Sequence, residues 1–450
     1  MSDGEAGIEY DQIKRVSTSD ALITRLSNSR LIAVRPKSAV LKYEKLESNA
    51  VTAGKELQVE SVLEGNIQHI EDRVRVTVQL VRVEDGATMW ADKFEELTTN
   101  ALMVQDMISA QVVRALALCL NSEQESLLNK RYTENAEAQK FYLQGRFLWN
   151  QRTPTSLTKS IEFFERAKTK DPQYALVYVG LADSYQLLAE YRAMSPNEAF
   201  TKARTAATKA LEIDPNLAEA HTSLAYTLAF YDWNWDAADK EFKKAIELNP
   251  NYATARQWYS EFLIARGRFD EAIMELKKAQ ELDPLSLIIH ADIAGYFYIS
   301  RQYDKSIEQS NKIIELDPNF AYGYAFLWIS YEQKGMPDES VKVLLKSLHL
   351  WGETQEIIKQ RKEAYEKSGV KAYWQKNLEQ TEVPEPRKFI MAIDMAIIYL
   401  RVDDKEKAIE WLQKSYAARE RWLINIKHDP QWDGIRSDPR FVEIVQKIGL

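Results

Sequence analysis

The phrase Ala-Leu-Glu-Ile-Asp-Pro at 210–215 decides the fold, because close variants of it recur along the middle of this 450-residue chain. Each variant joins a helix-favouring stretch to Asp or Asn and then proline, and the others stand at 167–172, 245–250, 279–284 and 313–318. The five prolines, Pro172, Pro215, Pro250, Pro284 and Pro318, lie 43, 35, 34 and 34 residues apart. Since proline does not continue a helix, each phrase marks a helix end. The spacing predicts units of two helices with a period of about 34 residues.

Small side chains recur where the two helices of such a unit must cross closely. Twelve residues before each proline the chain has Ser160, Ala203, Ala238, Ala272 and Ser306. Five before, it has Ala167, Ala210, Ala245 and Ala279, and only Ile313 departs. The chain therefore resembles tetratricopeptide-repeat proteins over about residues 135–350. The resemblance implies an all-α solenoid, a right-handed superhelix of helical hairpins.

Beyond the regular units the pattern continues less strictly. A sixth unit is expected at about 319–352 and a more divergent seventh at 388–421. The stretch 354–380 reads as two amphipathic helices broken at Gly369, and 430–450 as a turn followed by a closing helix at 440–448.

The segment before residue 130 changes period. Val74, Val76, Val78 and Leu80 alternate with polar residues, which indicates a half-buried strand. Asp85-Gly86 is a hairpin signal, and it joins this strand to a partner at 87–94. Further strands are expected at 59–67 and, as a short buried run, at 31–35, with helices at 18–26, 49–57 and 103–120. This order predicts a small α+β domain with helices covering a sheet.

Several phrases of this segment resemble the TolB-like amino-terminal domain of bacterial regulators. They are Ala21-Leu-Ile-Thr-Arg-Leu-Ser27, Val62-Leu-Glu-Gly-Asn66, 73–80, Met89-Trp-Ala-Asp92 and Val104-Gln-Asp-Met-Ile108, together with the ending Arg436-Ser-Asp-Pro-Arg-Phe441. The resemblance implies a module that follows a winged-helix, kinase or cyclase effector domain. None of those effectors is visible in this sequence, and the family's first strand, which ends in Pro-Phe, is missing before residue 18. We therefore expect a fragment or a shortened paralogue.

These observations divide the chain into four parts. A tail covers 1–17, the TolB-like α+β domain 18–130, and the solenoid of about six repeats 131–352. Divergent repeat-like helices and a C-terminal capping helix cover 353–450. A strand edge near 60–95 offers a weak basis for a homodimer through the α+β domain.

Composition and motifs argue against several function classes. Lys and Arg number 59 against 67 Asp and Glu, a net charge of −8, which disfavours nucleic-acid binding by this chain. Cys119 is the only cysteine, the five histidines stand singly, and no phosphate loop or nucleophile elbow occurs. We therefore expect no enzyme, no catalytic residues, no metal and no cofactor. His221 and His290 fall at equivalent repeat positions and are interpreted as packing residues.

No apolar run is long enough to cross a bilayer, and the N-terminus carries no secretory signal pattern. The compartment is not fixed by the sequence. The default expectation is cytoplasmic, and the alternative is the extracytoplasmic part of a membrane-anchored regulator.

The first helices of stacked repeats line a concave groove, which is the usual binding surface of a solenoid. The groove-facing positions by helical spacing include Tyr142, Arg146, Trp149, Asp183, Gln186, Tyr226, Gln257, Glu261, Tyr298, Tyr322 and Glu332. The slots that hold Lys and Asn in carboxylate-clamp repeats here hold Asp183, Thr222, Tyr226 and Glu261, which disfavours that clamp. We predict a groove for an extended or helical protein segment with apolar anchors and a basic residue. The alternative is that some of these tyrosines pack between repeats.

Two functions remain open from the sequence. The first is a non-catalytic protein-binding scaffold, the sensor or adaptor part of a bacterial signalling or transcriptional regulator. The second is a regulatory domain that senses a small ligand at the junction of the α+β domain and the solenoid.

Overall fold

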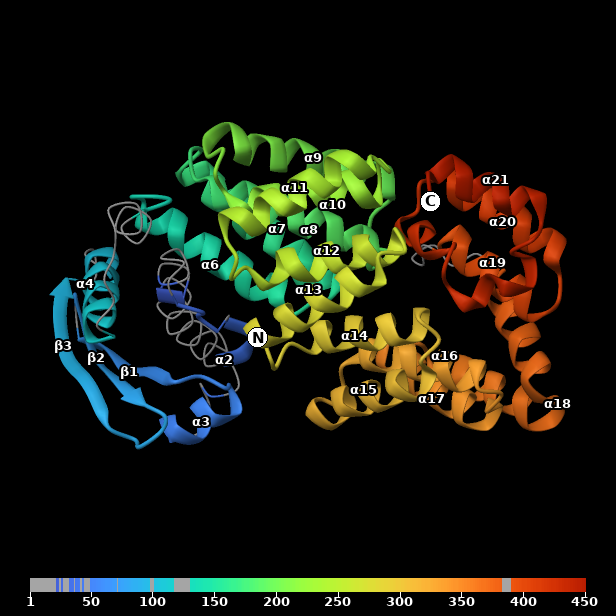
Figure 1. Cartoon of the computed structure of the whole chain (residues 1–450), viewed down its shortest axis with the longest axis horizontal. Coiled ribbons are helices and arrows are strands. Elements are labelled where there is room, and N and C mark those ends of the chain that lie inside the picture. Colours follow the sequence, from blue (N-terminus) through green and yellow to red (C-terminus); the bar gives the residue numbers. More distant parts are fainter. Residues whose placement is uncertain are drawn as a thin grey trace.

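The computed structural model describes residues 49–70, 72–97, 101–116, 130–382 and 390–450, together with 22, 23, 26, 32–35, 37–40 and 43. Helical hairpins form most of this part of the chain, and a small sheet lies towards its N-terminal end (Figure 1). The sheet and the C-terminal helices lie at opposite ends of the long axis in Figure 1. Cys119 and most of the helix expected at 18–26 lie outside the described residues.

Six consecutive hairpins form the middle of the molecule. They are α6 (Ala136–Asn150) with α7 (Pro154–Lys170), α8 (Ala175–Glu190) with α9 (Pro196–Ile213), α10 (Ala218–Phe230) with α11 (Trp235–Leu248), α12 (Ala253–Ala265) with α13 (Phe269–Leu282), α14 (Leu287–Ile299) with α15 (Tyr303–Leu316), and η3 (Ala321–Tyr324) plus α16 (Ala325–Gln333) with α17 (Pro337–Leu350). In the first five, the second helix ends directly before the Asp or Asn of the repeated phrase. The helix ends predicted from the prolines are confirmed.

Close helix crossings depend on the small residues identified in the sequence. Ser160, Ala203, Ala238, Ala272 and Ser306 are all fully buried. The ring of Phe164 lies between Gly145 and Gly180, and a Cβ at either glycine would come within 2.5 Å of that ring. Glycine is therefore required at both positions for the first two hairpins to approach each other.

The turn between successive repeats is held in the same way five times. The carbonyl of each repeat proline accepts a hydrogen bond of 2.8–2.9 Å from the side chain six residues later, namely Tyr178, His221, Arg256, His290 and Tyr324. These side chains differ chemically, but each brings an O–H or N–H to a carbonyl at a helix end. The equivalence of His221 and His290 expected from the sequence is confirmed.

The small domain contains a three-stranded antiparallel sheet in the order β1 (Ser61–Ile70), β2 (Arg73–Arg82), β3 (Thr88–Leu97). Val76 pairs with Ile67 on one side and Phe94 on the other, and helix α4 (Ala101–Ala115) packs on the apolar face through Ile108. Two short helices, α2 (Lys37–Val40) and α3 (Ala50–Glu56), precede the sheet. The strands expected at 59–67, 74–80 and 87–94 are confirmed.

The strand expected at 31–35 is wrong, because residues 32–35 form no strand. A run of a few apolar residues shows no period that would separate a strand from a partly buried loop. In the structure this loop serves instead to attach the small domain to the repeats.

Arg35 makes that attachment. Its guanidinium donates to the carbonyls of Leu57 and Gln58 at the end of α3, both at 2.8 Å, and to the carbonyls of Glu281 and Leu282 at the end of α13. A helix C-terminus carries partial negative charge, so one cation between two such ends stabilises both. The small domain thereby docks beside the fourth hairpin.

The C-terminal part begins with α18 (Gln355–Thr381), whose helical geometry is interrupted at Ser368 and at Gly369, which has a φ of 77°. The interruption expected at Gly369 is confirmed. A further hairpin, α19 (Ala392–Arg401) with α20 (Lys405–Ala417), lies within the unit expected at 388–421. Two 3₁₀ turns, η4 (Arg421–Asn425) and η5 (Pro430–Ile435), lead to α21 (Pro439–Ile448).

This last segment folds back onto the earlier repeats. Trp235 donates its indole Nε1 hydrogen to the carbonyl of Ile448 at 2.7 Å, and Arg266 donates to the carbonyl of Gly449 at 2.5 Å. Further along, Arg301 forms an ion pair of 2.8 Å with Asp433. The C-terminal end of the chain therefore contacts the third, fourth and fifth hairpins as well as the end of the helical stack.

Candidate functional site

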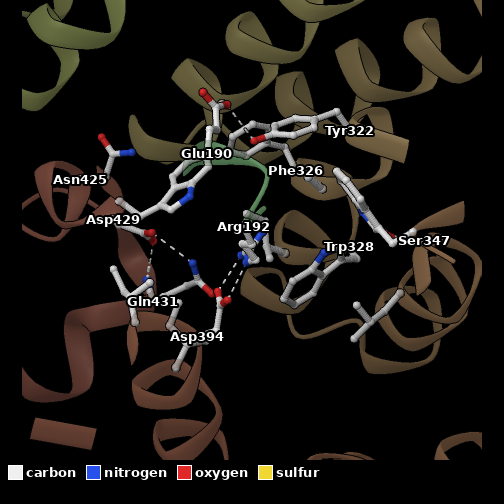
Figure 2. A pocket seen from close by; sticks show the side chains of 18 of the residues that line it. Glu190, Arg192, Tyr322, Phe326, Trp328, Ser347, Asp394, Asn425, Asp429 and Gln431 are labelled. Atoms are coloured by element: carbon white, nitrogen blue, oxygen red, sulfur yellow. Dashed lines mark hydrogen bonds and ion pairs between the residues drawn. The ribbon is translucent and has the colours of Figure 1, made fainter. Parts of the chain in front are cut away.

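The repeats and the C-terminal segment enclose a cavity of about 760 Å³ (Figure 2). Its wall comes from the first helices of the repeats on one side and from α18, α19, η4 and η5 on the other. The wall mixes aromatic rings with charged groups. A pocket of this size and composition is typical of ligand sites.

Arg421 joins the two sides of this cavity. Its side chain is 3% exposed, and it donates from Nε to the hydroxyl of Tyr226 at 2.6 Å and from Nη2 to the carboxylate of Glu261. Its Nε also lies 3.7 Å from Oε2 of Glu190. Burial opposes the charge of this guanidinium, but the carboxylates of Glu190 and Glu261 outweigh it, so the pKa of Arg421 lies above its usual value.

Aromatic rings surround the same guanidinium. Its central carbon lies 4.4 Å from the ring centroid of Trp422, 5.1 Å from that of Phe230 and 5.6 Å from that of Tyr226. Such distances allow cation–π attraction, which strengthens where water is excluded. The concave wall of α8, α10 and α12 is thus shaped for a guanidinium, and the chain's own Arg421 occupies that place.

Glu190 links distant repeats through its carboxylate. It accepts a hydrogen bond of 3.0 Å from Tyr226 on one oxygen and of 3.2 Å from Tyr322 on the other. Figure 2 shows the second of these contacts at the rim of the site. Because Glu190 ends α8 and Tyr322 begins the sixth repeat, the concave face curves enough to bring the second and sixth repeats into contact.

Two more carboxylates lie in this wall. Burial raises the pKa of Glu261 to about 6, although Arg421 opposes this shift. Burial and the nearby charge of Glu261 raise the pKa of Asp292 well above its usual value. Asp292 accepts a hydrogen bond of 2.7 Å from the amide of Gln257, and among the described residues it forms no ion pair. On this side of the cavity three carboxyl groups, those of Glu190, Glu261 and Asp292, thus face two guanidinium groups, those of Arg421 and Arg152.

The opposite side of the cavity is held by matched pairs. Arg192 and Asp394 form a two-pronged ion pair, with both distances at 2.8 Å (Figure 2). Arg401 makes a similar pair with Glu332, at 2.9 and 2.7 Å, while its guanidinium lies 5.1 Å from the ring centroid of Trp328 and 4.6 Å from that of Trp374. Planar paired hydrogen bonds of this kind fix geometry strongly. These groups hold the C-terminal helices against the repeats.

The predicted groove residues separate into two sets. Gln257, Glu261, Tyr298 and Tyr322 line the cavity, while Tyr226 and Glu332 lie behind its wall as the partners of Arg421 and Arg401. Tyr298 donates to Asp429 of the C-terminal segment at 3.0 Å. These residues come together as the helical spacing implied, but the C-terminal segment covers them.

The remaining five predicted residues connect neighbouring repeats. Trp149 is 3% exposed and lies between the guanidinium groups of Arg146 and Arg152. Arg146 pairs with buried Asp183 at 3.2 Å, and Gln186 donates to the carbonyl of Ser223 at 2.6 Å. Tyr142 packs against the rings of Phe164 and Tyr174. Tyr142 is the one tyrosine of this set, and the alternative weighed from the sequence, packing of some tyrosines between repeats, applies to it alone.

Comparison with known proteins identifies the repeats. The family model described as "Tetratricopeptide repeat" matches residues 234–291. This part of the chain consists of tetratricopeptide repeats. The crystal structure of YrrB, described as a tetratricopeptide protein with an unusual peptide-binding site, is similar at 18% identity and a TM-score of 0.29, covering 44% of this chain and 97% of that one.

Two curated relatives are similar to this chain over about 200 residues. "Putative adenylate cyclase 3" of Rhizobium meliloti (strain 1021) is 23% identical over 214 residues, which are 47% of this chain and 36% of the relative. "Transcriptional regulator HilA" of Salmonella typhimurium is 25% identical over 199 residues, 44% of this chain and 35% of the relative. The matched stretch spans about a third of the length of these relatives.

Several residues of the cavity were not predicted from the sequence, above all Arg421, Glu190 and Asp292. Asp292 lies in α14 at a position that nothing in the repeat pattern marks. Arg421 lies just after the last hairpin, outside the repeats, so the repeat spacing gives no indication that its side chain reaches the cavity. Among the described residues, no helix is both long and apolar enough to cross a membrane.

Proposed function

We propose that this chain is a non-catalytic binding scaffold, the sensor or adaptor part of a bacterial regulator, and that its cavity receives a short segment of a protein partner. The tetratricopeptide fold supports a role in protein–protein interaction. The names of the two curated relatives, a transcriptional regulator and an adenylate cyclase, support a module that different effectors use.

The cavity of about 760 Å³ is the observation that carries this proposal. The C-terminal segment covers the concave face at Tyr226 and Tyr298, so a long segment does not lie along the whole face. The cavity has room for a few residues, and its rings and charged groups offer the mixture that peptide recognition uses.

A cavity-filling variant tests this proposal. Ile288 lies on the cavity wall, and Ile288→Trp places a larger side chain there. Met274→Trp, on α13 and 55% exposed, makes a comparable change outside the cavity. Affinity capture with the wild-type chain and Met274→Trp should recover the same partner, and Ile288→Trp should lose it. A partner retained by Ile288→Trp would place the binding surface elsewhere.

Sensing of a small molecule is the second candidate, favoured by the cavity volume, which falls within the range of about 300–1,000 Å³ common for such ligands. This cavity lies between the repeats and the C-terminal helices, a different junction from the one expected from the sequence. A thermal-shift screen against metabolites separates the two functions. A metabolite whose stabilisation disappears in Ile288→Trp, together with no captured protein, would favour this second function.

A further inference from the structure

We propose that the cavity recognises a basic side chain, an arginine or lysine carried by a segment of a partner protein, and that Asp292 and Glu261 are the groups that bind it. This inference rests on the proposed binding of a protein segment and names the chemistry of that segment. It follows from three features of the wall: an occupied guanidinium site, an excess of carboxylates and unpaired or exposed groups suited to a peptide.

The site of Arg421 shows directly what this wall binds. The hydroxyl of Tyr226 and the carboxylate of Glu261 accept its hydrogen bonds, and the ring of Trp422 lies 4.4 Å from its central carbon. Carboxylate and phenol acceptors with aromatic faces are the common surroundings of guanidinium groups. The wall therefore has the chemistry of a basic-residue site before any partner arrives.

The carboxyl groups of this wall outnumber its two nearby guanidinium groups, those of Arg421 and Arg152. Three carboxylates face the region, those of Glu190, Glu261 and Asp292, each from a different inner helix. Arg421 pairs with the first two, whereas Asp292 has only the amide of Gln257 among its described partners. A further cation beside Asp292 and Glu261 would balance the remaining carboxylate.

Neighbouring groups favour a side chain on a peptide over a bare ion. Tyr191, Tyr322 and Trp351 form a cluster of rings with centroids 5.7–6.3 Å apart on the wall, and Trp351 is 47% exposed. Such rings cover the aliphatic stem of a lysine or arginine. The buried indole Nε1 of Trp422 has no hydrogen-bond acceptor among the described residues, so it is free to donate to a peptide carbonyl.

A metal ion fits this wall poorly. Among the described residues, no group of three His, Cys, Asp or Glu side chains converges in the way a metal site requires. The occupant that the geometry favours is therefore an organic cation with an apolar stem.

Selection from a random heptapeptide library on the immobilised full chain tests the inference without a known partner. We define cavity binders as peptides that compete with one another for the wild-type protein and that do not bind the Ile288→Trp variant. We expect these to be enriched in arginine or lysine. Replacing that residue by citrulline or glutamine, with wild-type protein throughout, should weaken binding by about tenfold or more, because a charged hydrogen bond becomes a neutral one.

Asp292→Asn provides the protein-side test. It should weaken binding of the selected peptide by about tenfold, and the matched variant Asp304→Asn, at a side chain that is 85% exposed on α15, should leave binding within about twofold. Cavity binders without a basic residue, or equal binding of the arginine and citrulline forms, would overturn this inference and leave the proposed function standing. Failure to select any peptide sensitive to Ile288→Trp would overturn both.

Discussion

The Nε hydrogen of Arg421 reaches the hydroxyl of Tyr226 at 2.6 Å, across 195 residues of chain. This contact joins the end of the last hairpin to the third repeat and closes the concave face at its centre. Glu261 and Glu190 complete the surroundings of the same guanidinium. At its centre the closed face therefore contains one buried cation with two carboxylate neighbours.

Replacing Arg421 by alanine should lower the free energy of unfolding by about 3–5 kcal/mol, because Glu190 and Glu261 would remain buried without their cation. Urea unfolding measures this change, and hydrogen exchange should show faster exchange in η4, η5 and α21. Arg440→Ala removes a more exposed arginine, 39% exposed and paired with Glu406 and Asp438, and should cost much less. Equal losses in the two variants would contradict the role assigned to Arg421.

Arg35→Gln should release the small domain from the repeats. The guanidinium bonds carbonyls at the ends of both α3 and α13, and charged hydrogen bonds of this kind contribute about 1.5–3 kcal/mol. Small-angle scattering should show a larger radius of gyration, with faster hydrogen exchange after Leu57 and Leu282. Arg75→Gln, which removes an exposed pair with Glu95 within the sheet, should change neither quantity. An unchanged radius in Arg35→Gln would mean that other contacts hold the domain.

The wall carboxylates predict a loss of stability with rising pH. Burial raises the pKa of Glu261 to about 6 from 4.5, and burial also raises that of Asp292. The folded state then holds its protons more tightly than the unfolded state. The contribution of these groups to stability is present below pH 4.5 and is lost as the pH rises through about 6.

Asp292→Asn isolates part of this effect. The variant should be more stable than wild type by a margin that grows between pH 4 and 7, because it lacks the carboxyl that must ionise in a buried place. Thermal unfolding at a series of pH values measures the margin. A pH-independent margin for Asp292→Asn would contradict the assignment.

His221 and His290 occupy the same repeat position but should respond to pH in opposite directions. Burial alone would lower the pKa of His221, but its bonds to Glu241 and to the carbonyl of Pro215 raise it overall. Burial lowers the pKa of His290, whose Nδ1 accepts from Gln309 at 2.5 Å. The first histidine therefore favours its charged form in the folded state, and the second its neutral form.

The contribution of His221 to stability is present below its ordinary pKa of 6.5 and is lost as the pH rises through the raised value. That of His290 is present above 6.5 and is lost as the pH falls through the lowered value. The cost of His221→Gln should thus be larger at pH 5.5 than at pH 8, and the cost of His290→Gln larger at pH 8. Urea titrations at both pH values measure the four costs, and parallel trends would contradict this account.

The repeated hairpins were predictable because their signals are local. Proline at Pro215 or Pro250 ends a helix through its own ring and missing N–H, and a small residue such as Ala203 permits a crossing through its own size. Such rules act within a few residues, so one sequence suffices to apply them. The strand predicted at 31–35 was wrong because this run is too short to show a period. Its four described residues, of mixed polarity, carry too little pattern for a local rule to act on.

The candidate site was predictable only in part. Helical spacing places Tyr226 and Glu261 on inner faces, and the structure has them there. The same spacing cannot show that Arg421 packs against this concave face. Its position depends on the curvature of several successive hairpins, which decides where the C-terminal segment meets the earlier repeats. Contacts such as Tyr322 with Glu190, 132 residues apart, follow from accumulated superhelical curvature and leave no mark in local sequence.

An open stack of helical hairpins stretches like a coil spring, since each turn touches only its neighbours. The bonds from Trp235 to Ile448 and from Arg301 to Asp433 cross-link repeats to the C-terminal segment and so oppose this stretching. A force that pulls the two ends of the stack apart would act on these cross-links before the helical hairpins separate. The molecule should therefore hardly extend under a small force, and it should extend abruptly when these bonds break. Because the same bonds hold the cavity closed, mechanical tension and occupancy of the cavity should affect one another.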